Sequence, residues 1–177
     1  MNATLAAWNA AGESAALGAM LACCGSRQWA QAMVTQRPFA SVWALSEAAD
    51  RAWGAMRETD WLEAFASHPR IGERKPALVT AHPSHDPVAR SAEWSRQEQF
   101  AARAANELVL AELAEDNQRY ERLFGFTYIV CATGKSAAEM LTILKRRLAN
   151  DRVSELREAA EQQRQIMQIR LGKWLVE

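Results

Sequence analysis

Apolar residues recur every three or four positions along most of the chain, which places them on one face of an α-helix. The clearest stripe lies near the C-terminus, at Leu156, Ala160, Met167, Leu171 and Trp174, and it requires a partner surface. The same pattern predicts helices over residues 14–24, 27–35, 41–56, 60–66, 88–105, 107–124, 137–150 and 152–176.

Helix starts carry their own signals. Ser136 with Glu139 matches the capping box, in which each residue bonds the backbone N–H of the other, and Asp60 with Glu63 resembles it. Alanine, leucine, glutamate, arginine and glutamine, which favour helix, dominate the chain. We therefore expect a helix to begin at each of these two places.

Two segments break the helical pattern. Residues 68–87 contain four of the five prolines and all three histidines, which predicts a long loop of the kind that is often functional. Residues 124–134 mix β-branched and aromatic side chains between glycines, which favours a short extended connector. The fold expected for residues 1–177 is a single-domain, all-α bundle of about eight helices with this one connector.

Composition excludes several classes of protein. The chain has 21 basic and 21 acidic residues, so no basic excess points to nucleic acid or an anionic membrane. No apolar run approaches the ~20 residues of a membrane helix. Three cysteines without a C-x-x-C pair, no secretory signal and no C-terminal peroxisomal address predict a reduced, cytoplasmic location.

His68 is the first candidate for chemistry. Pro69 disfavours helical angles at His68, so the imidazole is expected where a helix ends. Imidazole titrates near neutral pH and can give or take a proton. The plain structural alternative is a helix-terminal histidine bonded to a carbonyl group.

Ser95, Glu98 and Gln99 fall on one helical face, where a hydroxyl, a carboxylate and an amide could bind a flat polar ligand. The alternative is an ordinary solvated face. Arg170 borders the C-terminal apolar stripe, where a guanidinium is costly unless it meets an anion. The alternative there is an arginine whose stem crosses the core edge and whose head reaches water.

The connector is a third candidate. Backbone groups of residues 128–132 that are not paired in a sheet need partners, and a ligand could supply them. The alternative is a buried connector bonded to its neighbours. His82 and His85 lack the spacing of a zinc site, so no metal is expected. Trp43, Trp53 and Trp61 are expected to pack in the core.

Taken in order, these motifs resemble those of 2-oxo-4-hydroxy-4-carboxy-5-ureidoimidazoline (OHCU) decarboxylases. The resemblance runs from about Phe39 to the C-terminus and rests on an ordered set: His68-Pro69-Arg70-Ile71-Gly72, Ser95-x-x-Glu98-Gln99, Phe124-Gly125-Phe126 with Tyr128-Ile129-Val130-Cys131-Ala132, Leu144-x-x-Arg147-Leu148-x-Asn150, Glu155-Leu156 and Ile169-Arg170-Leu171. Thr127 stands where many relatives have proline, and Tyr128 could add a hydroxyl near the pocket.

The resemblance implies an all-helical, cofactor-free lyase of urate degradation that forms (S)-allantoin and acts as a homodimer on a small ureidoimidazoline. By the same resemblance, His68 is the catalytic acid, Glu98 the essential carboxylate and Arg170 the arginine that contacts substrate. The positions implied to bind substrate are Pro69, Ser95, Arg96, Gln97, Glu98, Gln99, Tyr128, Ile129, Val130, Cys131 and Ala132.

The implied chemistry suits these residue types. The substrate carries its carboxylate beside a ring C=N, which accepts the electrons released with CO₂, so no organic cofactor is required. The protein would supply orientation and one stereospecific proton. Two other classes remain open: a non-catalytic ureide-binding module, and a metal-dependent hydrolase built on His68, His82 and His85.

Overall fold

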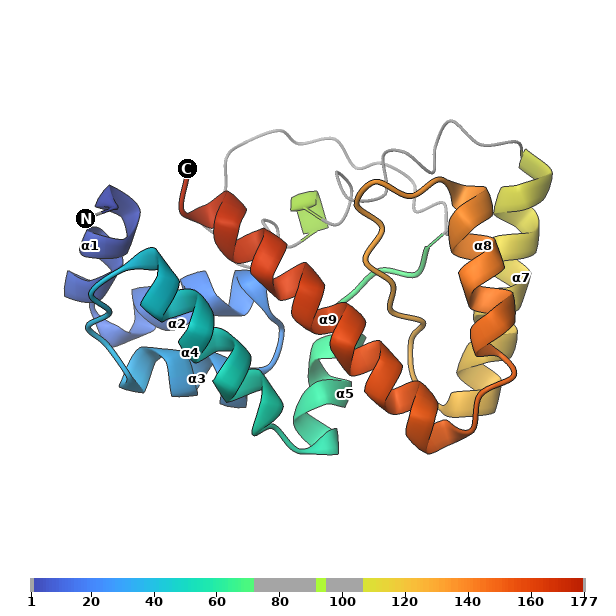
Figure 1. The fold of residues 1–177 in the computed structure, drawn as a ribbon, viewed down its shortest axis with the longest axis horizontal. Coiled ribbons are helices and arrows are strands. Elements are labelled where there is room, and N and C mark those ends of the chain that lie inside the picture. The colour runs from blue at the N-terminus through green and yellow to red at the C-terminus, as the bar shows by residue number, and fades with distance from the viewer. Residues whose placement is uncertain (1, 72–91, 95–106, 177) are drawn as a thin grey trace.

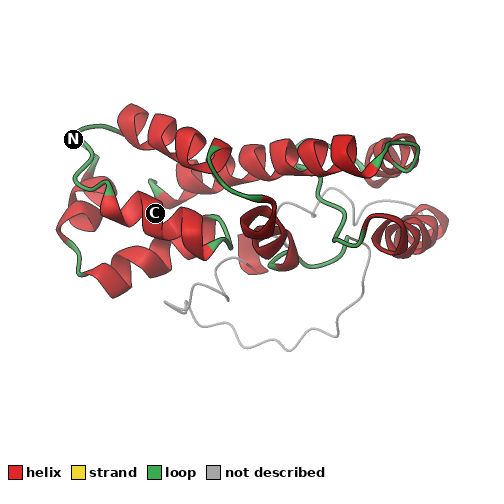
Figure 2. Ribbon diagram, turned by 90° about the horizontal axis from the view of Figure 1, so that it is seen from below, coloured by secondary structure: helices red, strands yellow, loops and turns green. Residues whose placement is uncertain are grey.

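The computed structural model describes residues 2–71, 92–94 and 107–176, and in these residues the chain forms helices and loops without a strand (Figures 1 and 2). The helices are α1 (Ala3–Ala10), α2 (Glu13–Cys23), α3 (Arg27–Thr35), α4 (Val42–Gly54), α5 (Glu58–Ala66), α7 (Glu107–Phe124), α8 (Ala137–Arg147) and α9 (Arg152–Trp174). The predicted all-α class is confirmed.

Helix α1 was not predicted. Asn2 caps it by accepting the N–H of Leu5 at 3.0 Å, and Leu5 and Trp8 are buried one turn apart. The Asn2 amide also donates to the carbonyl of Leu175 at 2.9 Å, which ties the two ends of the described chain together. The cap and the Leu5–Trp8 spacing were visible in the sequence and could have predicted this helix.

Serine caps begin helices α3 and α4. Ser26 accepts from the Trp29 N–H and Ser41 from the Ala44 N–H, which begins α3 and α4. Trp29 is fully buried between these helices and donates its indole N–H to the carbonyl of Ala49 at 3.1 Å. Trp53 is buried as expected, but Trp43 is 73% exposed, so the expectation that it packs in the core is wrong.

The start of α5 differs from the prediction. Asp60 is the third residue of the helix and its carboxylate accepts the N–H of Arg57 at 3.0 Å. Glu63 instead accepts the N–H of Arg27 at 2.9 Å, across to α3. The helix therefore begins two residues before Asp60, because the carboxylate at its third position can serve the free N–H before the first turn.

Helices α7 and α8 pack side by side and are joined by the predicted connector (Figure 1). Gly125 ends α7 with a φ of +81°, a left-handed conformation that suits glycine, and its N–H donates to the Glu121 carbonyl. The capping box predicted at the start of α8 is confirmed: Glu139 accepts from the Ser136 N–H at 2.7 Å, and Ser136 Oγ from the Glu139 N–H.

Helix α9 crosses the molecule and packs against α2, α4 and α5 (Figure 1). Its predicted apolar stripe is buried throughout. Trp53 donates its indole N–H to the carbonyl of Ala160 at 2.9 Å, which fixes α4 against α9. Glu155, Gln163 and Arg170 are buried in the same helix, so α9 carries polar groups into the core.

The predicted helix over 88–105 lies outside the described residues except for the helical turn at 92–94. Most of the predicted loop over 68–87 also lies outside them. No helix in the described ranges is long and apolar enough to cross a membrane.

Candidate functional site

His68 lies directly after α5, where the sequence places it. Its backbone N–H donates to the Phe65 carbonyl at 3.1 Å and closes the last turn, and Pro69 follows. The proline cannot continue the helix, so the chain turns away at this point and the imidazole stands at a helix end.

The His68 imidazole is held neutral. Its Nε2 atom is buried and has no hydrogen-bond partner among the residues that the structure describes. Burial, together with the nearby positive charge of Arg170, lowers the pKa of His68 to about 3, while the Gln163 side chain acts in the opposite direction. At neutral pH the ring carries one proton and no charge.

Arg170 is the second predicted residue at this place. It is 1% exposed on α9, so the alternative in which its head reaches water is wrong. Ile166, Met167 and Trp174, its helical neighbours, are buried with it. The structure therefore brings the imidazole of one element and the guanidinium of another close enough to interact electrostatically.

Gln163 and Cys24 were not predicted. Gln163 is fully buried seven residues before Arg170 on the same helix, and its Nε2 atom donates to Cys24 Sγ at 3.8 Å. Burial raises the pKa of the Cys24 thiol to about 12, so this thiol keeps its proton. A glutamine among the buried positions of an apolar stripe was a signal that sequence reasoning could have used.

The connector residues Tyr128 to Ala132 are all buried. The Cys131 N–H donates to Gln162 Oε1 at 2.9 Å, and the Cys131 carbonyl accepts from Lys135 Nζ at 2.7 Å. The Tyr128 hydroxyl donates to the Met140 carbonyl in α8 at 3.2 Å. Hydrogen bonds within the protein therefore satisfy several connector groups for which a ligand was considered as the partner. The bond from Gln162 holds the connector against α9, next to Gln163.

A buried polar cluster fixes the connector from the other side. Arg147 of α8 donates to the Ile129 carbonyl at 2.7 Å and to the Glu155 carboxylate of α9 at 2.8 Å. Tyr120 donates a short hydrogen bond to the same carboxylate, and Asn150 donates at 2.8 Å. Burial raises the pKa of Tyr120, so its hydroxyl stays a donor.

Other predicted residues lie outside the described part of the chain, namely Ser95, Arg96, Gln97, Glu98 and Gln99, together with His82 and His85. Pro69 is half-buried beside His68. Within residues 2–71, 92–94 and 107–176, no three His, Cys, Asp or Glu side chains are grouped to hold a metal ion.

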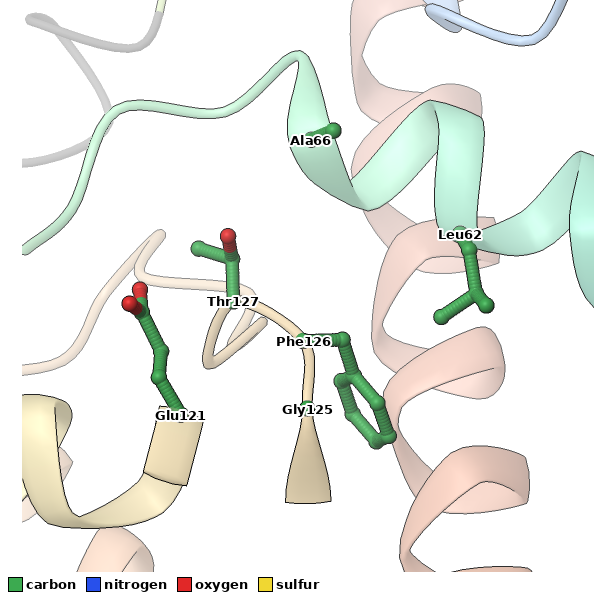
Figure 3. Close-up of a pocket in the computed structure, with 6 residues that line it drawn as sticks. All are labelled: Leu62, Ala66, Glu121, Gly125, Phe126 and Thr127. Atoms are coloured by element: carbon green, nitrogen blue, oxygen red, sulfur yellow. The ribbon is translucent and has the colours of Figure 1, made fainter. Parts of the chain in front are cut away.

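A separate open hollow of about 240 Å³ lies between the end of α5 and the end of α7 (Figure 3). Leu62 and Ala66 line one side, and Glu121, Gly125, Phe126 and Thr127 line the other. Glu121 is paired with the Arg70 guanidinium by bonds of 2.7 and 2.8 Å. Among the residues that the structure describes, no predicted catalytic or substrate-binding residue lines this hollow, so it is distinct from the His68–Arg170 pair.

Comparisons with known proteins agree on one family. The OHCU decarboxylase family model matches residues 9–172. A uric acid degradation bifunctional protein of Arabidopsis thaliana is 40% identical over 85% of this chain and 44% of its own length. A Bacillus protein of the same description is 32% identical over 53% of this chain and 19% of its own length. This chain thus spans less than half of the length of these curated relatives.

A solved structure agrees with this assignment. It is a crystal structure of OHCU decarboxylase in the presence of (S)-allantoin, and it superimposes with a TM-score of 0.74 at 35% identity, covering 90% of this chain and 99% of that one. The ordered motifs, the helical fold and these matches agree, and the chain belongs to the OHCU decarboxylase family.

Proposed function

We propose that this protein decarboxylates OHCU to (S)-allantoin without a cofactor. The observation that carries the proposal is the neutral His68 imidazole, whose Nε2 atom is buried, beside the buried Arg170 guanidinium, in a chain of this family. The (S)-allantoin named for the solved relative identifies the product class.

The reaction needs little more than orientation and proton transfer. The bond to the carboxylate breaks, its electron pair moves into the new ring double bond, and the ring nitrogen of the C=N takes a proton. The hydroxyl then loses its proton as the carbonyl forms, and the neighbouring ring carbon gains one. The net change is release of CO₂ and uptake of one proton, and the face protonated decides the (S) configuration.

His68 suits the second half of this sequence. Because the resting ring is neutral, it can accept the hydroxyl proton and return it to the neighbouring carbon on one face. In this proposal Glu98 bonds the substrate hydroxyl or orients His68, and Ser95, Gln99 and the connector hold the ring and the ureido arm.

The proposal is tested by following ellipticity while the protein acts on OHCU, freshly made from urate by urate oxidase and the hydrolase of the next step. We expect a signal of (S)-allantoin that grows with enzyme concentration, while uncatalysed decay gives racemic product. His68→Asn should lower this signal by about 10²–10⁴-fold. Normal turnover by that variant would remove His68 from the mechanism.

Two further outcomes separate the alternatives. Reversible ureide binding without CO₂ release would identify a binding module instead of an enzyme. Loss of activity with a chelator would favour the metal-dependent hydrolase.

We also propose that the protein works as a homodimer in a reducing compartment such as the cytoplasm. Large apolar side chains exposed on the described surface would be available to a second copy: Val42, Trp43, Leu108, Leu123, Val153 and Val176. Cys23, Cys24 and Cys131 are buried and form no disulfide, which suits a reducing compartment. Analytical ultracentrifugation tests the dimer, and a monomer at assay concentrations would refute it.

A further inference from the structure

Two buried polar atoms next to the candidate site lack hydrogen-bond partners among the described residues. One is Nε2 of His68 and the other is Oε1 of Gln163. An unpaired polar atom in a protein interior costs free energy, so each such atom requires an explanation. Here one atom can carry a proton and the other can only accept one.

The Gln163 side chain lies close enough to His68 to act on its pKa. A Cβ atom added to Gly25 would lie 2.3 Å from Ser67 Oγ, so the segment after α2 passes directly over the residue before His68. Cys24, the residue before Gly25, accepts a hydrogen bond from Gln163 Nε2. The amide nitrogen of Gln163 is therefore engaged with Cys24, and its carbonyl oxygen is the atom left for His68.

The geometry points to Gln163 as a positioning residue that holds the proton of neutral His68 on Nε2. The lone pair then lies on Nδ1, which is the acceptor that the proposed proton transfer requires. This inference rests on the proposed function for its catalytic meaning but not for the tautomer itself. The effect of Gln163 on the pKa of His68 agrees with this inference, since the Gln163 side chain opposes the fall in that pKa.

The test is the tautomer of His68 in the resting protein at neutral pH. Two-bond ¹H–¹⁵N correlation spectra distinguish a protonated ring nitrogen from an unprotonated one, and a His68→Gln variant identifies the signals among only three histidines. We expect Nε2–H in the wild-type protein. A predominant Nδ1–H tautomer would overturn the inference, because the amide would then donate to Nε2 instead of accepting from it.

Variants of the amide provide the second arm. Gln163→Met keeps the volume but removes the acceptor, and we expect mixed tautomers and a kcat about 10- to 100-fold lower with a smaller change in KM. Gln163→Glu keeps an acceptor and should restore Nε2–H. Gln165→Met is the matched control, because Gln165 bonds Glu161 on the surface of the same helix.

The outcomes are separable from those of the proposed function. A wild-type tautomer and kcat retained in Gln163→Met would overturn the positioning role even in an active enzyme. Nε2–H in the wild-type protein, lost in Gln163→Met, would support it even if the protein failed to decarboxylate OHCU.

Discussion

Arg147 and Glu155 form an ion pair with a shortest N–O distance of 2.6 Å, and both side chains are 0% exposed. Arg147 also stacks over the rings of Tyr120 and Tyr128, at 5.9 and 4.9 Å from their centroids. The pair joins α8 to α9 and, through the Ile129 carbonyl, fixes the connector. A buried charge of this kind is tolerated only while its partner remains.

Glu155→Gln is therefore expected to destabilise the fold by about 3–5 kcal/mol, because it leaves the Arg147 charge buried and uncompensated. The measurement is the free energy of unfolding in denaturant. Glu58→Gln is the control, since Glu58 pairs with Arg152 at 2.6 Å on the surface and should lose about 1 kcal/mol or less. Equal losses in the two variants would contradict the structural role of the buried pair.

The neutral state of His68 predicts a pH dependence of stability. The folded pKa, about 3, lies below the ordinary value of 6.5, so the unfolded chain binds more protons between these values. Stability should therefore rise with pH across this window and fall as the solution is acidified, by up to about 1.4 kcal/mol per pH unit. Denaturant unfolding of the wild-type protein and of His68→Gln at several pH values measures the difference. Parallel curves would show that His68 is not held neutral by the fold.

Gly25→Ala should destabilise the protein because the new Cβ would lie 2.3 Å from Ser67 Oγ and 2.4 Å from Ser67 Cβ. We expect a loss of about 1–3 kcal/mol, typical of overpacking, and a lower kcat because Ser67 precedes His68. Thermal unfolding and the ellipticity assay measure these effects. Adding Ser67→Gly should recover much of the stability.

Gly172→Ala is the control for that variant, since its added Cβ in α9 would meet no side chain or neighbouring backbone of the described residues within 4 Å. It should stabilise the helix by about 0.5–1 kcal/mol. If Gly25→Ala behaved in the same way, the close approach to Ser67 would be refuted.

Gln162→Leu removes the acceptor of the Cys131 N–H, which is bonded at 2.9 Å. The unpaired buried N–H should cost about 1–3 kcal/mol and exchange faster with solvent. Hydrogen exchange of the Cys131 amide measures this, with the Cys24 amide, bonded to the Met20 carbonyl within α2, as an internal control. Unchanged protection at Cys131 would mean that other contacts hold the connector.

Local signals explain what could be predicted. The bounds of α3 match the prediction at both ends, and α7, α8 and α9 agree within three residues at each described end, because caps and apolar spacing act within a few turns. The start of α5 was misplaced because an aspartate can cap a helix either as the N-cap residue, as predicted for Asp60, or from the third helical position, where Asp60 lies. Helix α1 was missed although Asn2 and Leu5 marked it.

The sequence by itself determined the helical class and the family, and it pointed to His68 and Arg170, because motif order and helical periodicity are properties of the chain. Only the tertiary structure decided that Arg170 is buried beside a neutral His68, that Gln163 and Cys24 join them, and that Trp43 lies outside the core. Those facts depend on how α2, α5 and α9 pack together, and burial is what changes a side chain's pKa and the cost of an unmet hydrogen bond.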